Sequence, residues 1–561
     1  MHILRSSALL CGLALVACGG SSSNPPDAPP GGMTADAAKP DAAPSGPCGG
    51  IDEKGVCSTS TQLRVCVTPS GGGAPKLEVH DCRQGETCHI VDDKAACILT
   101  AECLEGATQC TSGTAIRTCT GGHWVASTCP KSCVPSPLGD ACGLDATTKA
   151  FTGTLQYQAR GPNDPNQPTD WSALGTVAGQ GFLVVSARIA GSDVTVIDTT
   201  TTAVGGATPG SFSVQVPSAP TANDYIVFLA AGTTTDPVTK QLRIQFAVID
   251  PNLDAAAQPY DVGTVGTAPS IWKWSGKVSE LTSGGTITIG EQNFSGAARV
   301  FDVARYVHGS DAQRFPGKAQ VPLAIWIGVG VGWSCGACQG AFPTTQFGTD
   351  FGAQMFLGGG DDQEYWSDAV TAHELGHWTM GTYGFIVGEG GQHCIGVPDA
   401  PGLGWSEGWA TWFSSDARED PLYYDKQQGS FFWLDLSQRT GYAWVRPDAG
   451  DGLLQDIDEN EISAMMWSLS STQGLGHAPL DTALASKRMT APTFARGYTR
   501  HTWDVDNTCH RVNIADSGES TTCFADFLDA LRCGGVSAAK IDVATEPGTH
   551  YPYPSGAPLC Q

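Results

Sequence analysis

Hydrophobic and polar residues alternate with a period of two through the middle of the chain. Phe212, Val214 and Val216 alternate with polar neighbours, as in a strand that is buried on one face. Other short runs rich in Val, Ile and Phe lie between about residues 151 and 250, and Gly, Pro, Asn and Asp separate them. This pattern predicts a β-sandwich over residues 150–265.

Beyond about residue 284 the pattern mixes two periods. In "AARVFDVARYVH", Val300, Phe301, Ala304 and Val307 share one helical face. "VPLAIWIGVGV" predicts a buried strand, "AQMFLGGG" a short edge strand, and the segment from about residue 364 to 380 a helix. Strands followed by a helix predict an α+β domain, which we assign to residues 285–561.

The N-terminus carries an apolar run, about residues 8–17, that is too short to span a bilayer and fits an export signal. It ends in Leu15-Val16-Ala17-Cys18, which resembles the lipobox of bacterial lipoproteins. The resemblance implies a signal peptide over residues 1–18, cleavage before Cys18 and a lipid on that cysteine. Because Gly19 follows, it also implies a protein anchored in the cell envelope, at the outer membrane or cell surface.

Residues 19–47 are rich in Pro, Gly, Ser and Asp and have almost no large apolar side chains, which predicts a disordered tether. Twelve of the 21 cysteines follow, in two sets of six that define Cys-rich repeats over residues 48–97 and 98–142. "CSTSTQLRVC" in the first repeat matches "CTSGTAIRTC" in the second. In an exported chain this pattern predicts roughly three disulfides per repeat, and zinc clusters are the alternative.

The seven cysteines after Cys142 include the pair in "CGAC", Cys335 and Cys338. A disulfide between them is favoured in an oxidising compartment, while a redox dithiol and half of a zinc site with His393 and Cys394 are alternatives. Because seven is odd, one cysteine is expected to pair elsewhere or stay unpaired, and Cys394 is the candidate.

The formal net charge of −25 argues against nucleic acid and anionic membrane surfaces as partners. No later segment is apolar enough to span a membrane. The predicted contact with the membrane is therefore the lipid anchor alone.

Candidate chemistry lies in "TAHELGHWTM". Residues i and i+4 of a helix project from the same face, so His373 and His377 can converge on one zinc ion. Glu374 is rotated about 100° from His373 and can reach a water molecule as a general base. A catalytic zinc site needs a third protein ligand.

"HELGH" together with "WSEGWA" (Trp405 to Ala410) resembles the gluzincin metallopeptidases. The resemblance implies a zincin-like domain in which His373, His377 and Glu407 bind Zn²⁺. It implies that Glu374 is the general base for attack of water on a peptide bond of a protein or peptide substrate. It also implies that the strand "AQMFLGG" pairs with the substrate backbone, which suits an endopeptidase.

A further donor normally stabilises the oxyanion in such chemistry, and the sequence does not rank the candidates His393, Tyr383 and His477, or Tyr498 and His501. "GWSEG" fits the G-x-S-x-G elbow of serine hydrolases, with Ser406 as the nucleophile. "ENEISAMMWSL" predicts a helix whose acidic residues form a solvated face. The rival function is a cell-surface binding or adhesion protein with a structural or vestigial zinc site.

Overall fold

A computed structural model describes residues 15–17 and most of residues 48–560 of the 561-residue chain. Cys18 and the predicted tether lie outside the described residues. The gaps after residue 48 are 49–50, 52–53, 60–61, 68–74, 82–85, 92–93, 100–106, 121, 137–138, 144–146, 192, 236–241, 292–293, 361, 394, 428, 443, 445–452, 491–495, 497, 506–510 and 547–549.

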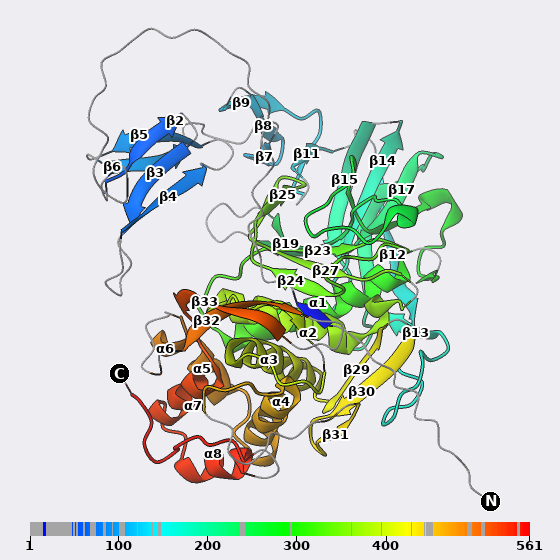
Figure 1. Cartoon of the computed structure of the whole chain (residues 1–561). Helices are drawn as coiled ribbons and strands as arrows, with labels where there is room; N and C mark the ends of the chain where they lie inside the picture. The colour runs from blue at the N-terminus through cyan, green and yellow to red at the C-terminus, as the bar shows by residue number, and fades with distance from the viewer. Residues whose placement is uncertain are drawn as a thin grey trace, which may run out of the picture. The chain divides into compact units, whose positions relative to one another are not determined.

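The chain is a multidomain, mixed α/β protein that is rich in sheets and contains several disulfides (Figure 1). It divides into two compact units, Ser21–Asp145 and Met1–Gly20 with Ala146–Gln561. Among the described residues, no helix combines the length and apolar character needed to cross a membrane.

The smaller unit consists of short antiparallel strands held by disulfides. The matching segments of the two repeats both form hairpins, β2 with β3 and β7 with β8. The disulfides Cys48–Cys66 and Cys57–Cys88 lie within the first repeat, and Cys110–Cys133 and Cys129–Cys142 lie within the second. The prediction of disulfides within each repeat is confirmed for these pairs. The strands are β2 (Val56–Thr59), β3 (Gln62–Val67), β4 (Lys76–Asp81), β5 (Glu86–Val91), β6 (Lys94–Leu99), β7 (Thr108–Cys110), β8 (Ala115–Thr120), β9 (His123–Thr128), β10 (Cys133–Val134) and β11 (Ala141–Cys142).

The larger unit begins with two four-stranded sheets. Phe212, Val214 and Val216 of β16 are buried, as the alternating pattern predicted. One sheet has the order β13-β12-β16, with β22 parallel to β12, and the other has the order β15-β14-β17-β21. The strands are β12 (Thr148–Ala159), β13 (Gly175–Ala178), β14 (Leu183–Ala190), β15 (Asp193–Thr201), β16 (Ser211–Pro217), β17 (Asp224–Leu229), β21 (Lys273–Lys277) and β22 (Thr286–Ile289).

A six-stranded sheet carries the rest of the unit, with the order β18-β19-β23-β27-β24 and β20 beside β19. The expectation that "AQMFLGGG" forms an edge strand is wrong: β27 lies between β23 and β24, and all five of its residues are buried. The edge strand is β24. The strands are β18 (Ala231–Thr235), β19 (Leu242–Asp250), β20 (Ser270–Ile271), β23 (Leu323–Ile327), β24 (Cys338–Gly340) and β27 (Ala353–Leu357).

Strands from both sides of residue 265 share these sheets. β19 pairs with β23, and β12 pairs with β22, each in parallel. The segment assigned to the β-sandwich and the segment after residue 285 therefore lie within one compact unit.

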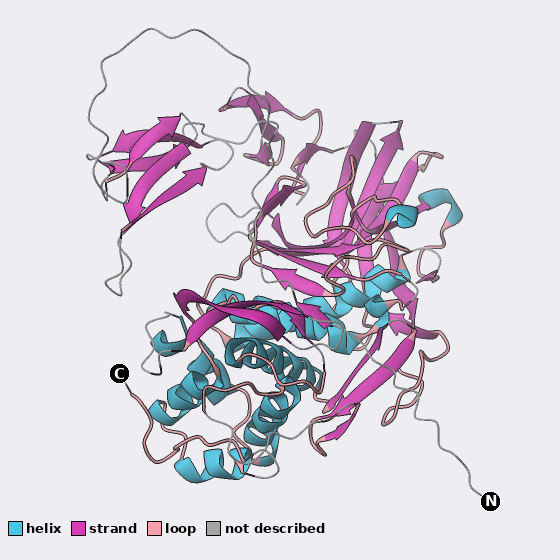
Figure 2. Cartoon of the chain, in the orientation of Figure 1, coloured by secondary structure: helices cyan, strands magenta, loops and turns pink. Residues whose placement is uncertain are grey.

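Helices α1 to α8 lie below the six-stranded sheet in the orientation of Figures 1 and 2, whereas β14, β15 and β17 lie above it. The predicted helix near residue 364 is divided at Ser367, whose hydroxyl accepts a hydrogen bond from the Val370 N–H and begins α2. The helices are α1 (Ser295–Arg314), α2 (Asp368–Tyr383), α3 (Pro401–Arg418), α4 (Glu459–Trp467), α5 (Ala478–Leu484), α6 (Lys487–Thr490), α7 (Phe524–Cys533) and α8 (Ala538–Thr545), with shorter turns η1 (Ala255–Ala257), η2 (Val278–Glu280), η3 (Glu364–Trp366) and η4 (Ser468–Thr472).

Small antiparallel pairs complete the unit. β1 pairs with β28, β25 with β26, β30 with both β29 and β31, and β32 with β33. Their bounds are β1 (Leu15–Ala17), β25 (Thr344–Gln346), β26 (Thr349–Phe351), β28 (Gly391–His393), β29 (Leu422–Gln427), β30 (Ser430–Asp435), β31 (Thr440–Gly441), β32 (Thr499–Val505) and β33 (Arg511–Ser520).

For the cysteines of this unit, the sequence analysis predicted a disulfide in "CGAC" and one cysteine that pairs elsewhere or stays unpaired. Cys335 and Cys338 form the expected disulfide, and Cys533 pairs with Cys560. Cys394 lies outside the described residues, and the free cysteine among the described ones is Cys523, which is buried.

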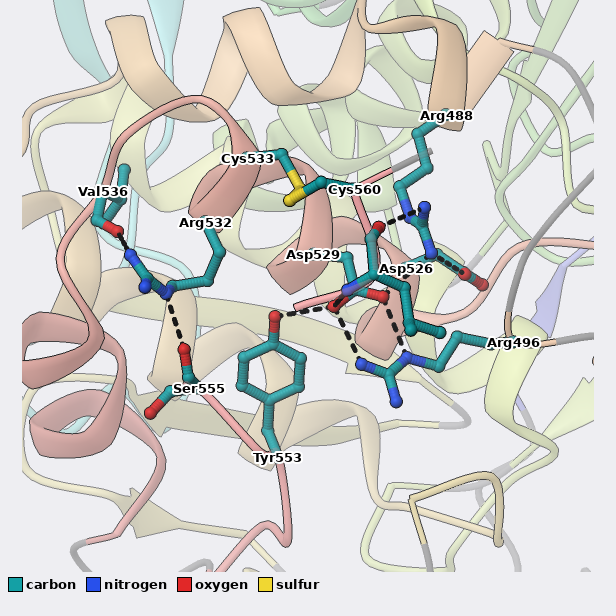
Figure 3. Close-up of a disulfide and its surroundings, with 11 residues drawn as sticks. Arg488, Arg496, Asp526, Asp529, Arg532, Cys533, Val536, Tyr553, Ser555 and Cys560 are labelled. Atoms are coloured by element: carbon teal, nitrogen blue, oxygen red, sulfur yellow. Dashed lines mark hydrogen bonds and ion pairs between the residues drawn. A yellow bond between two sulfur atoms is a disulfide. The ribbon is translucent and has the colours of Figure 1, made fainter. Parts of the chain in front are cut away.

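Asp529 of α7 ties the C-terminal segment to the helices (Figure 3). Its carboxylate accepts hydrogen bonds from Arg488, Arg496 and the Tyr553 hydroxyl at 2.8–2.9 Å, and from the backbone N–H of Leu559 at 3.1 Å. The Cys533–Cys560 disulfide lies beside this network.

Candidate metal centre

Helix α2 places His373 and His377 one turn apart on one face, as their spacing predicted. Their Nε2 atoms are 3.1 Å apart, and His373 is only 5% exposed. The helix is buried along almost its whole length, because it packs between α1, α3 and the six-stranded sheet. The two histidines are therefore interior groups and not exposed side chains of a surface helix.

Glu407 approaches the same point from α3, which begins at Pro401 with a proline in its first turn. Its Oε2 atom lies 3.1 Å from the Nε2 atom of each histidine. The three donor atoms thus form a triangle with equal sides. Ligands of a tetrahedral zinc ion at its usual bond lengths are about 3.3 Å apart, so this donor set fits zinc without rearrangement of the helices.

Hydroxyl groups on α3 hold the other nitrogen of each ring. Thr411 Oγ1 is 3.0 Å from His373 Nδ1, and Ser406 Oγ is 3.2 Å from His377 Nδ1. Such contacts orient metal-binding imidazoles and fix the nitrogen that each presents. Ser406 itself lies inside a helix, as do both glycines of "GWSEG", so the strand-to-helix elbow of a serine hydrolase is absent at this site.

The pKa shifts of two of the three donors suit a cation-binding site. For the third, His377, burial acts to lower the pKa, but the Glu407 carboxylate outweighs burial and raises it. Burial lowers the pKa of His373 to about 4, which keeps its ring neutral at pH 7. Burial acts to raise the pKa of Glu407, but His377 and His393 outweigh it and hold that pKa well below its ordinary value. A neutral imidazole and an ionised carboxylate are the forms that bind metals.

Glu374 lies beside this cluster on α2 and is 4% exposed. Burial raises its pKa to about 8, and the charge of His377 opposes this shift. A raised pKa makes the ionised form of Glu374 a stronger base, although without a bound cation the group is mostly protonated at pH 7.

A cavity of about 310 Å³ leads to the cluster. His377 and Glu407 line it from the helices, Gln339 and Gly340 line it from the edge strand β24, and Arg500 lines it from β32. The candidate centre is therefore open to a ligand from the side of the sheet edge.

Of the oxyanion candidates His393, Tyr383 and His477, the structure brings His393 to the cluster. His393 Nε2, on β28, lies 3.9 Å from Glu407 Oε2. Tyr383 instead stacks on Phe315 at the end of α1, with the ring centroids 3.9 Å apart, and His477 precedes α5 and acts on the pKa of Asp416.

Of the two others named, the Tyr498 hydroxyl donates to Glu389 over 2.8 Å, and the backbone N–H of His501 donates to the same carboxylate over 2.7 Å. Glu389 lines the cavity. Tyr498 and His501 thus bond to a residue of the cavity wall.

Glu459 is a site residue that the sequence analysis missed. It was assigned to a solvated face, but it is 3% exposed, and its Oε2 lies 3.5 Å from His393 Nε2. A signal was present in the sequence: Glu459 and Glu461 lie about 200° apart around α4, so a single solvated face cannot hold both.

Comparisons with known proteins assign no family to the chain. No family model and no curated protein matches it. Among solved structures, a 9R-lipoxygenase from Cyanothece PCC8801 matches at 11% identity with a TM-score of 0.13. The match covers 32% of this chain and spans about a quarter (27%) of the lipoxygenase chain, and so low a score carries no argument about fold or function.

Proposed function

We propose that this protein is a zinc metallopeptidase of the gluzincin type, exported and anchored to the cell envelope by a lipid on Cys18. The observation that carries the proposal is the triangle of His373 Nε2, His377 Nε2 and Glu407 Oε2, each 3.1 Å from the others. The motifs "HELGH" and "WSEGWA" support it, because the three ligands come from them.

His373, His377 and Glu407 would hold the ion, and Thr411 and Ser406 would fix the rings. When bound, zinc supplies a Lewis acid and lowers the pKa of a water molecule. Glu374 takes a proton from the attacking water and delivers it to the leaving amine.

The substrate would be a protein or peptide that enters along the cavity. β24 forms the edge of the six-stranded sheet, and two of its residues line the cavity. An extended peptide can add to a free sheet edge through backbone hydrogen bonds that do not depend on chain ends. This arrangement favours an endopeptidase, with β24 in the role that the sequence assigned to "AQMFLGG".

The test is metal analysis together with cleavage of casein or gelatin by the wild type and by Glu374→Gln. We expect both proteins to bind zinc and only the wild type to cleave, because the amide cannot accept the proton. Glu280→Gln, an exposed glutamate far from α2 in sequence, is the matched control and should cleave like the wild type. Cleavage by Glu374→Gln at the rate of the wild type would show that Glu374 is not the general base.

A second candidate function is surface binding or adhesion with a structural zinc site. The observation that favours it is His393, whose Nε2 lies 3.9 Å from Glu407 Oε2 and would be a fourth protein donor, because structural zinc sites have four protein ligands. Stoichiometric zinc without cleavage of any protein substrate by the wild type would favour this function.

A further inference from the structure

A second cluster of potential ligands lies next to the first and shares Glu407 with it. His393 of β28, Glu407 of α3 and Glu459 of α4 place their ligand atoms within 4.8 Å of one another. All three residues are at most 3% exposed. The His393 Nε2 atom is 3.5 Å from Glu459 Oε2 and 3.9 Å from Glu407 Oε2.

The hydrogen bonding of His393 decides which atom faces the carboxylates. Its Nδ1 is 3.0 Å from the backbone carbonyl oxygen of Gly391. A carbonyl only accepts, so Nδ1 carries a hydrogen that it donates to Gly391, and Nε2 is the ring atom that faces the two carboxylates. Three potential ligand atoms therefore converge on one buried point, where a metal ion could lie between them.

Glu459 gives an independent indication. Its Oε2 atom is fully buried and has no hydrogen-bond partner among the described residues. Within the same described part of the chain, neither Glu407 nor Glu459 has a Lys or Arg nitrogen within 4.0 Å. A buried carboxylate oxygen without a hydrogen bond is unfavourable, and a metal ion is one way to compensate it.

We propose that His393, Glu407 and Glu459 bind a second divalent transition-metal ion, with Glu407 as the carboxylate shared between the two sites. The proposal rests on the proposed metal centre through Glu407, but it does not require hydrolysis. One imidazole and two carboxylates suit zinc and its first-row neighbours, whereas calcium takes six or more oxygen ligands. The chain would then carry a two-metal centre, a type in which the ions lie about 3.5–4 Å apart.

The experiment is a metal count on the full chain, stripped with a chelator and then equilibrated with Zn²⁺. We expect two zinc ions per wild-type chain and one per Glu459→Gln chain, because the amide is a poor metal ligand. Glu280→Gln, the exposed control, should bind two. A single ion in the wild type, or two in Glu459→Gln, would overturn the proposal.

A second measurement guards against a variant that does not fold. With Co²⁺ in place of zinc, two ions that share a carboxylate couple magnetically, so the electron paramagnetic resonance signal of the wild type should weaken when the second equivalent binds. Glu459→Gln should keep the full signal of an isolated ion. An uncoupled two-ion signal in the wild type would contradict the shared Glu407.

The outcomes separate this proposal from the proposed function. Two bound ions without peptide cleavage would retain the second site and reject the peptidase. One bound ion together with peptide cleavage would reject the second site and retain the peptidase.

Discussion

Asp311 carries a buried carboxyl group where α1 meets α2. The Thr379 hydroxyl donates to its Oδ2 over 2.5 Å, and its Oδ1 has no hydrogen-bond partner among the described residues. Burial raises the pKa of Asp311 to about 7, although Thr379 and Arg314 act to lower it. Between its unfolded pKa near 4 and pH 7, the folded state binds more protons than the unfolded state, so stability falls as the pH rises.

We therefore predict that Asp311→Asn raises the free energy of unfolding at pH 8, on the order of 3 kcal/mol, and changes that free energy little at pH 4. At the lower pH the wild-type group is protonated and resembles the amide. Urea unfolding at the two pH values measures the difference, with the exposed Asp193→Asn as the control. Equal effects of Asp311→Asn at both pH values would contradict the raised pKa.

Single residues also show how much of the candidate site could be predicted from the sequence. The i, i+4 spacing of His373 and His377 was enough to predict convergence, because helix geometry fixes it locally. The role of Glu459 was missed because its burial depends on α4 packing against α3. That packing joins segments about fifty residues apart, which no local pattern encodes.

At the scale of elements, the contact between α2 and α3 decides whether the proposed metal ligands meet. The helices approach closely at Gly376, the fourth residue of "HELGH", where a Cβ atom would lie 2.9 Å from the Cα of Ala410. Glu407 lies one turn before Ala410 on α3, and His377 directly follows Gly376. The glycine thus sets the distance across which the three ligands converge.

We predict that Gly376→Ala destabilises the protein by about 1–3 kcal/mol, as overpacking does, and weakens zinc binding. Chemical unfolding and competition with a chelator measure the two effects. Gly309→Ala on α1 is the matched control, since a Cβ there meets nothing within 4 Å. The control should be neutral or stabilise by up to about 1 kcal/mol, and an equal effect of both substitutions would contradict the close contact.

Elements were predicted well where the pattern is local and poorly where pairing is distant. The helix near residue 364 was found, and its true start at Asp368 reflects the capping hydroxyl of Ser367. The strand "AQMFL" was found too, but its place inside the sheet depends on β24, which the hydrophobic pattern did not mark. The order of strands in a sheet is a long-range property.

For the molecule as a whole, the C-terminal segment is held by Asp529, which is fully buried and bonds Arg488, Arg496 and Tyr553 (Figure 3). Removing the carboxylate would leave the largely buried guanidinium groups of Arg488 and Arg496 without this anionic partner. Removing one partner from a buried ion-pair network is strongly destabilising, because the remaining charges stay buried without compensation. Replacing the whole network by apolar residues costs much less.

We predict that Asp529→Asn lowers the free energy of unfolding by about 3–5 kcal/mol. Denaturant unfolding of the full chain, with its disulfides intact, measures the loss. Glu546→Gln, on an exposed side chain after α8, is the control and should change stability by less than about 0.5 kcal/mol. A loss in Asp529→Asn no greater than that of the control would show that the network does not anchor the segment.

The packing of α7 on α3 also sets an order of events in time. The ring of Trp405, two residues before Glu407, stacks on Phe527 with the centroids 4.7 Å apart and on Phe524 at 6.0 Å. A chain made from its N-terminus produces α3 more than a hundred residues before α7. Trp405, on the helix that carries Glu407, therefore stays uncovered by these rings until nearly the whole chain has been synthesised. Under the proposed function, the metal site that includes Glu407 would be completed only at a late stage of the protein's maturation.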